Sequence, residues 1–218
     1  MASEIVVNLA VEDELSEHLL RAAITQTGRP MLVAAVHGRK GCGYLKKMLP
    51  AFQKAARGLA WLVMTDLDLC PCAPELIEDW FGCRIDHYAA HRHPNLIFRI
   101  AVRESESWVM ADREAFADFL GIAARNIPAE TDTIIDAKKC LLDLARMSRK
   151  RDLRNDLVPR LGDKRMIGPD YNGRLAGFVH SSWRASRAKT ASPSFRRAFS
   201  ALNVFHPVLK SGINRRTD

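Results

Sequence analysis

The sequence predicts an α/β protein: a mostly parallel, Rossmann-like sheet flanked by helices, followed by a basic, mainly helical extension. Three observations support this prediction. Four short apolar runs alternate with segments of helical periodicity, which favours a parallel or mixed sheet. Three of these runs end in carboxylates, and the charge balance changes from acidic to basic along the chain. The 218 residues suit one domain, or one domain with an appendage.

The first strand is predicted at residues 5–11, a run rich in β-branched side chains. Apolar residues then recur at helical spacing over residues 15–24. Glu12 is the first residue after the strand, and it is the acid of this segment for which we expect a functional role. Glu14 and Glu17 are expected to be surface residues, because negative charge is favourable at a helix N-terminus.

A glycine-rich loop follows the second predicted strand, at residues 31–36. The loop covers residues 37–43 and leads into a helix predicted over residues 44–57. Backbone N–H groups of such a loop, together with Arg39 and Lys40, could cradle a phosphate. The Walker pattern Gly-x-x-x-x-Gly-Lys-Ser/Thr is absent. The alternative is a simple turn that carries two exposed cations.

The third strand is predicted at residues 59–64, an apolar run that ends in Asp66 and Asp68. Because side chains alternate along a strand, these two carboxylates are expected to point the same way. Mg²⁺ would relieve their repulsion, since it binds oxygen ligands through one or two carboxylates. The alternative is a polar loop in which Asp68 caps the next helix, predicted at residues 74–81.

The fourth strand is predicted at residues 96–102, and acids follow it as well. If the extended form persists, Glu104 and Glu106 share a face; if a helix has begun, Trp108 and Asp112 share one instead. Trp108 is expected to pack in the core. Carboxylates that follow three strands at one edge of a sheet favour a metal site over coincidence.

The segment between the third helix and the fourth strand, residues 82–95, is expected to be irregular. Zinc has to be considered nearby, because three cysteines lie close in sequence to three histidines: Cys70, Cys72, Cys83, His87, His91 and His93. The Cys-Pro-Cys spacing is unlike that of structural zinc sites, and no second cysteine pair follows. Reduced, partly buried thiols are therefore expected.

The character of the chain changes beyond Gly121, and we predict a core at residues 1–125 and an extension at residues 126–218. Three further helices are expected, at residues 134–147, 175–183 and 193–202. Residues 161–172 are expected to be irregular, and Ser192 is suited to cap the last helix. Residues 207–218 are expected to form a frayed basic tail.

The net charge of +8 is unevenly distributed. Residues 1–137 contain 14 Lys and Arg against 19 Asp and Glu, whereas residues 138–218 contain 19 against 6. This pattern suggests a cation-binding site beside a surface that binds a polyanion such as nucleic acid. The alternative is a solvated basic face that aids solubility. No apolar run approaches the ~20 residues that span a bilayer, and the N-terminus lacks a signal core, so a cytoplasmic protein is expected.

These residues resemble a known fold. Glu12 after the first strand, Asp66-x-Asp68 after the third and the acids after the fourth resemble the Toprim domain of topoisomerases, bacterial primases and OLD-type nucleases. Residues 64–68, 99–112 and 192–197 more closely resemble an uncharacterised family of bacterial Toprim-like proteins, some encoded beside phage-defence genes. The likeness runs from the first strand to about Leu202. Its most specific part is Arg-Glu-Ser-Glu-Ser-Trp at residues 103–108.

The resemblance implies Mg²⁺- or Mn²⁺-dependent cleavage of DNA or RNA, with a role in phage defence. Glu12 would act as general acid/base, Asp66 and Asp68 would bind metal, and Glu104 or Glu106 would complete the metal sphere. A nucleic acid is the implied partner, and a defence-system ATPase is a further candidate partner. Backbone contacts would fall to basic residues: Arg39, Lys40, Arg103, Arg149, Lys150, Arg151, Arg154, Arg196 and Arg197.

Two other functions remain open from the sequence. Asp13 stands where the Toprim pattern usually has glycine, which suggests a non-catalytic module that binds nucleic acid or a partner protein. The loop from Gly38 to Gly43 suggests instead an enzyme that handles nucleotide phosphates.

Overall fold

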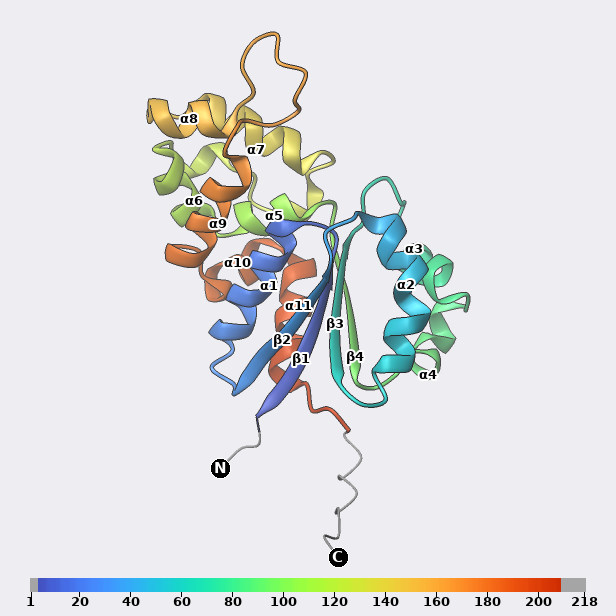
Figure 1. The fold of residues 1–218 in the computed structure, drawn as a ribbon. Helices are drawn as coiled ribbons and strands as arrows, with labels where there is room; N and C mark the ends of the chain where they lie inside the picture. Colours follow the sequence, from blue (N-terminus) through green and yellow to red (C-terminus); the bar gives the residue numbers. More distant parts are fainter. Residues whose placement is uncertain (1–3, 209–218) are drawn as a thin grey trace, which may run out of the picture.

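The computed structural model describes residues 4–208 and contains one sheet of four strands (Figure 1). The strands lie in the order β2-β1-β3-β4, and every neighbouring pair is parallel. Their bounds are Ile5–Val11 for β1, Met31–Gly38 for β2, Ala60–Asp66 for β3 and Leu96–Ala101 for β4. The fold is therefore α/β with a four-stranded parallel sheet between helices, which confirms the predicted class.

Helices cover both faces of the sheet (Figure 1). One face carries α2 (Cys42–Ala55), α3 (Ala73–Phe81) and α4 (Tyr88–His91). The other face carries α1 (Glu14–Gln26), α5 (Ser105–Ala111), α10 (Ala185–Ala191) and α11 (Pro193–Val204). Beyond them lie α6 (Arg113–Leu120), α7 (Ala137–Arg146), α8 (Arg151–Leu157) and α9 (Tyr171–Ser181). Short 3₁₀ turns occur at Ile85–His87, Ala124–Asn126 and Thr131–Thr133.

Side chains of the central strand β3 alternate between two cores, as the period of two in a strand requires. Leu62 and Met64 pack with α1 and the C-terminal helices, whereas Trp61 and Val63 pack with α2 and α3. The same alternation directs Asp66, the last residue of β3, toward the side of Leu62 and Met64. The strand thus delivers a carboxylate to the layer that contains the C-terminal helices.

The C-terminal helices share the larger core with the first strand and the first helix. Trp108 is fully buried, as predicted, and its indole donates to Ser194 Oγ at 2.8 Å. The indole of Trp183 in turn donates to the Trp108 carbonyl at 2.9 Å, and Phe195 packs edge-on against both rings. The location of a domain boundary near residue 125 stays a prediction.

Most predicted elements are confirmed, and the errors have identifiable causes. Three short helices were missed. α4 lies in the segment 82–95 that was expected to be irregular and has only four residues. α8 and α10 have seven residues each, with a strongly charged or an alanine-rich sequence. The helix after β4 is broken at Asp112, a buried residue that pairs with Arg187. Ser192 does cap α11, accepting from the Phe195 N–H at 3.1 Å.

The expectation that Glu17 is a surface residue is wrong. Its carboxylate is buried and pairs with Arg21 and Arg39, which makes it an internal counter-ion. The predicted tail lies largely outside the described residues, which end at Val208. Within residues 4–208, none of the helices is both long enough and apolar enough to span a membrane.

Candidate functional site

The carboxyl ends of β1, β3 and β4 meet at one edge of the sheet, and the predicted acids gather there. Glu12 follows β1, and its Oε1 accepts hydrogen bonds from the Thr65 hydroxyl and from the Asp66 N–H, the latter at 2.8 Å. Both donors belong to the end of β3. The strand register explains the contact. Ala10 of β1 pairs with Val63 of β3, so Glu12 and Thr65, each two residues further along its chain segment, come side by side.

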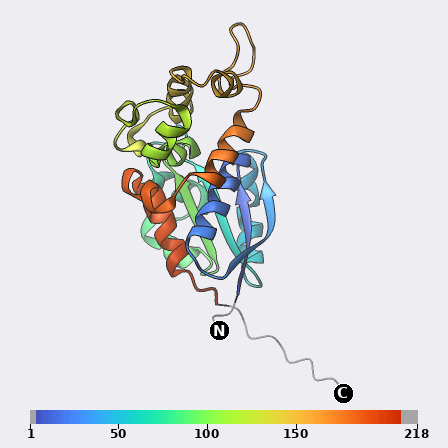
Figure 2. The same cartoon turned by 90° about the vertical axis from the view of Figure 1, so that its left-hand side faces the viewer.

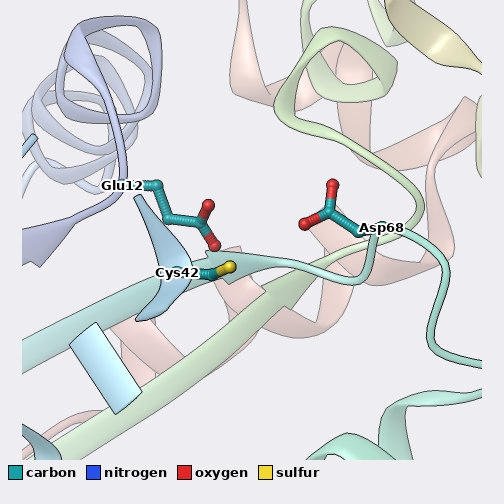
Figure 3. A group of neighbouring side chains, drawn as sticks. All are labelled: Glu12, Cys42 and Asp68. Carbon is teal, nitrogen blue, oxygen red and sulfur yellow. The ribbon is translucent and has the colours of Figure 1, made fainter. Parts of the chain in front are cut away.

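Glu12, Cys42 and Asp68 form the exposed part of this edge (Figure 3). One carboxylate oxygen of each acid and the thiol sulfur lie within 4.8 Å of one another. Cys42 is the first residue of α2, and Asp68 is exposed, with a left-handed backbone at φ 49°. Burial raises the pKa of Glu12, although the hydrogen bonds from Thr65 and Asp66 oppose the shift. Burial, and then the charges of Glu12 and Asp68, raise the pKa of the Cys42 thiol.

Asp66 forms the buried part of the edge, and the prediction that it points the same way as Asp68 is wrong. The strand ends at Asp66, so alternation does not extend to Asp68. Asp66 is only 8% exposed, and its Oδ1 has no hydrogen-bond partner within residues 4–208. Burial raises its pKa well above the usual value, and the carboxylates of Glu106 and Glu12 add to the shift. The expectation that Asp68 caps α3 is also wrong, because the cap position is Cys72.

Glu104 and Glu106 lie at the start of α5 and reach partners on the C-terminal helices. Glu104 occupies the N-cap position, and its Oε2 accepts from the Lys138 N–H at 2.7 Å. Glu106 is 1% exposed; its Oε1 accepts from the Tyr171 hydroxyl at 2.9 Å and lies 3.4 Å from Lys138 Nζ. Burial raises the pKa of Glu106 although Lys138 opposes the shift. Burial and Glu106 together raise the pKa of Tyr171 well above 10.

Asp13 has a structural role at this edge. Its side chain accepts from the Ser16 N–H at 2.8 Å and caps α1. Its φ of −144° is extended backbone that any residue can adopt, so this position does not require glycine. An aspartate directly after Glu12 is therefore compatible with the local backbone.

The glycine-rich loop after β2 packs closely against β1. A Cβ on Gly38 would lie 2.0 Å from the Val11 carbonyl oxygen, so only glycine fits this position. Arg39 forms an ion pair with the buried Glu17, and Lys40 lies 5.2 Å from the centre of the Tyr44 ring. Both predicted phosphate ligands therefore have partners within the protein, and their phosphate role stays a prediction.

The other predicted nucleic-acid contacts fall into two groups. Arg103, Lys150 and Arg154 donate to backbone carbonyls, with Arg103 binding Cys70 O at 2.6 Å. The second group is exposed and has no hydrogen-bond or ion-pair partner within residues 4–208: Arg149, Arg151, Arg196 and Arg197. These four do not form one patch, because α8 and α11 lie at opposite ends of the helical part (Figure 2). Their contacts with nucleic acid stay a prediction.

Three residues of the site were not predicted from the sequence: Cys42, Lys138 and Tyr171. No periodicity or motif separates Lys138 from the neighbouring Lys139, and Tyr171 begins a helix far from any strand end. Cys42 carried a weak signal, since it follows the glycine loop at a helix start. The five cysteines are free, and within the described residues the metal-ligand group contains Cys42 rather than Cys70, Cys72 or Cys83.

Comparisons with known proteins give limited information. No protein-family model matches the sequence, and no curated protein matches it. Among solved structures, the C-terminal region of the Burkholderia pseudomallei OLD protein is similar, with 15% sequence identity and a TM-score of 0.41. The alignment covers 90% of this chain and 96% of that one. At this level of similarity, the fold and the site have to be argued from the chain's own residues.

Proposed function

We propose that this protein is a divalent-metal-dependent nuclease with a Toprim-like site. The observation that carries the proposal is the convergence of acids from three strand ends at one edge of the sheet. Among them is Asp66, a buried carboxylate with an oxygen that lacks a hydrogen-bond donor within the described residues. A buried charge is costly unless it is paired or bound to a metal.

The residues present fit Mg²⁺ or Mn²⁺. These are hard cations that favour carboxylate oxygens. The edge offers such oxygens from Glu12 and Asp68, and the buried Asp66 lies near enough for the charges of both to raise its pKa. Burial raises the pKa of Glu12 and the pKa of Asp66, and neighbouring carboxylates add to both shifts. A bound cation would reverse these shifts. When bound, the metal would neutralise charge on the scissile phosphate and lower the pKa of a water nucleophile.

The acidic residues of the edge have two roles, metal binding and general acid/base catalysis. Asp66 and Asp68 would hold the metal, and Glu104 or Glu106 would supply a further ligand. Glu12 is the general acid/base; its Oε1 is fixed by Thr65 and the Asp66 N–H, which leaves Oε2 available for a proton.

Lys138 and Tyr171 set the charge of the buried part of the site. Lys138 binds Glu104 through its backbone N–H and pairs with Glu106 through Nζ, so it places one cation beside the acids. The hydroxyl of Tyr171 fixes the orientation of Glu106. The exposed arginines on α8 and α11 supply contacts with the nucleic-acid backbone that carry no sequence information.

The test is cleavage of labelled single- and double-stranded DNA and RNA in Mg²⁺ and in Mn²⁺. Asp68→Ala and Glu12→Gln should each lower the rate by ~10²-fold or more, as expected for a metal ligand and a general acid/base. Asp118→Ala is the matched control, because Asp118 is an exposed carboxylate on α6 with no side-chain partner within residues 4–208. Cleavage that survives both site changes would exclude these residues from the mechanism. Salt-sensitive binding without any turnover would instead support the non-catalytic module.

A further inference from the structure

A cavity of about 610 Å³ lies on the α2 side of the sheet, away from the acidic edge. It is formed by the end of α2, the end of α3 and the segment from α4 to β4. Its lining includes three permanent cations, Lys54, Arg57 and Arg92, and no carboxylate. Two aromatic side chains, Trp80 and Phe81, line it as well. Cations together with aromatic faces are the combination that binds single-stranded nucleic acids.

The cavity is rigidly built. The side-chain amide of Gln53 donates to the His91 carbonyl at 2.9 Å and accepts from the His93 N–H at 2.7 Å, which ties the segment before β4 to α2. Nδ1 of His93 accepts from the Asn95 N–H at 3.1 Å. In that tautomer Nε2 carries the proton and is available to donate. Trp80 is held against Phe98, with ring centres 5.4 Å apart.

A line of lysines on α2 connects the acidic edge to this cavity. Lys47 and Lys54 are seven residues apart, so they lie on the same face of the helix, two turns from each other. Both are exposed, and neither they nor Arg57 has an ion-pair partner within residues 4–208; the neighbouring Lys46 pairs with Asp79. α2 starts at Cys42 in the acidic edge and carries Gln53 to the cavity, about 17 Å further along its axis.

We infer that this face binds a single strand of nucleic acid that runs from the acidic edge along α2 into the cavity. Lys47, Lys54 and Arg57 bind its phosphates, and Trp80 stacks on a base in the cavity. A single strand fits better than a duplex, because only unpaired bases present a free face to an aromatic ring. The inference rests on the proposed nuclease function for its direction, but binding can be measured without cleavage.

The experiment measures fluorescence anisotropy of a labelled oligothymidylate 12-mer with the full chain in EDTA, where metal-dependent cleavage cannot occur. Lys54→Glu/Arg57→Glu should weaken binding at least tenfold. The slope of log affinity against log salt should fall by ~1.4, since each lost phosphate contact contributes ~0.7 for a single strand. Trp80→Ala should weaken binding about fivefold or more. The matched control is Lys164→Glu/Lys189→Glu, which reverses two exposed lysines outside the α2–α4 layer and should change affinity less than twofold.

Two further arms separate the possible ligands. A dinucleotide and a mononucleotide should bind at least tenfold more weakly than the 12-mer, because neither reaches along α2. Tight binding of the mononucleotide that depends on Lys54 would overturn the inference in favour of a nucleotide pocket. Equal losses in the test and control double variants would also overturn it, since net charge alone would explain them. If the binding predictions hold while no cleavage occurs under any metal, the nuclease proposal fails and this inference stands.

Discussion

The two helical layers that cover the sheet contribute differently to its acidic edge. The α2–α4 layer supplies the thiol of Cys42 and leaves Asp68 exposed beside it. The opposite layer closes over Asp66 and Glu106, and its Lys138 places a cation beside Glu106. The exposed part is therefore suited to exchange ligands with solvent, whereas the buried part is suited to hold charge in place. The predictions below test whether this division is real.

The largest expected effect is on activity when the buried part loses its cation. Lys138→Ala should lower the cleavage rate by ~10²–10³-fold, the usual result of removing one charge-stabilising group from a site. The Mn²⁺ concentration needed for half-maximal activity should not rise, because removing a positive charge does not weaken cation binding. Burial lowers the pKa of Lys138, but the nearby carboxylates, Glu106 foremost, raise it overall, so the side chain is charged at neutral pH.

The control for that prediction is the adjacent lysine. Lys139 pairs with Asp143 on the solvent side of α7, and Lys139→Ala should leave the rate unchanged. Equal effects of the two substitutions would assign Lys138 a role in stability alone.

A smaller effect, on stability, is expected from the hydroxyl that fixes Glu106. Tyr171→Phe removes a buried hydrogen bond to a carboxylate and should lower the free energy of unfolding by ~1–3 kcal/mol. For a chain of this size, this corresponds to a Tm decrease of ~2–4 °C per kcal/mol. Tyr44→Phe is the matched control, because its ring is half-buried and its hydroxyl makes no hydrogen bond within residues 4–208. The Tm of this control should stay within about 1 °C of the parent. If Tyr44→Phe lowers Tm as much as Tyr171→Phe does, the loss is not due to the hydrogen bond with Glu106.

Removing the carboxylate of Asp66 should raise stability in the absence of metal, whereas removing the hydroxyl of Tyr171 should lower it. Because its folded pKa is raised above the usual 3.8, the folded state binds more protons than the unfolded state. Stability in EDTA should therefore fall as the pH rises above 3.8 through the folded pKa. Asp66→Asn removes this loss and should raise Tm at neutral pH by about 2–4 °C, the equivalent of roughly one kcal/mol. The same variant should lose the thermal stabilisation that Mn²⁺ gives the parent. A variant that is less stable than the parent in EDTA would show that Asp66 is not under electrostatic strain.

The sequence predicted the acidic part of the site better than its partners, for a physical reason. Strand ends of a parallel sheet meet at one edge, so an acid that follows an apolar run is placed by topology alone. Glu12 and Asp66 could be found in this way. Lys138 and Tyr171 reach the site only through packing of helices joined by irregular segments, and helix packing leaves no short-range pattern in the sequence. Asp68 was misplaced because its left-handed backbone ends the alternation at Asp66.

The smallest effect is expected where α1 meets α9, the contact that attaches the later helices to the first strand's layer. His18 Nδ1 and His180 Nε2 lie 2.8 Å apart, so one neutral ring donates to the other. Burial, and then the charge of His18, lower the pKa of His180 below 6.5. Below pH 6.5 the unfolded state then binds more protons than the folded state, so this pair loses stability as the pH falls. This sign is opposite to that of Asp66, and the two can therefore be separated.

The measurement is Tm in EDTA between pH 8 and pH 5 in an Asp66→Asn background, which removes the opposing contribution of Asp66. Adding His180→Gln should flatten the decline on acidification, whereas adding His206→Gln should not, since His206 is exposed and has no hydrogen-bond or ion-pair partner within residues 4–208. The difference should be small, because the pair is partly exposed and solvent screens its charges. If His180→Gln leaves the acid slope intact, protonation of this pair does not weaken the attachment of α9. The acid sensitivity would then have to arise elsewhere in the protein.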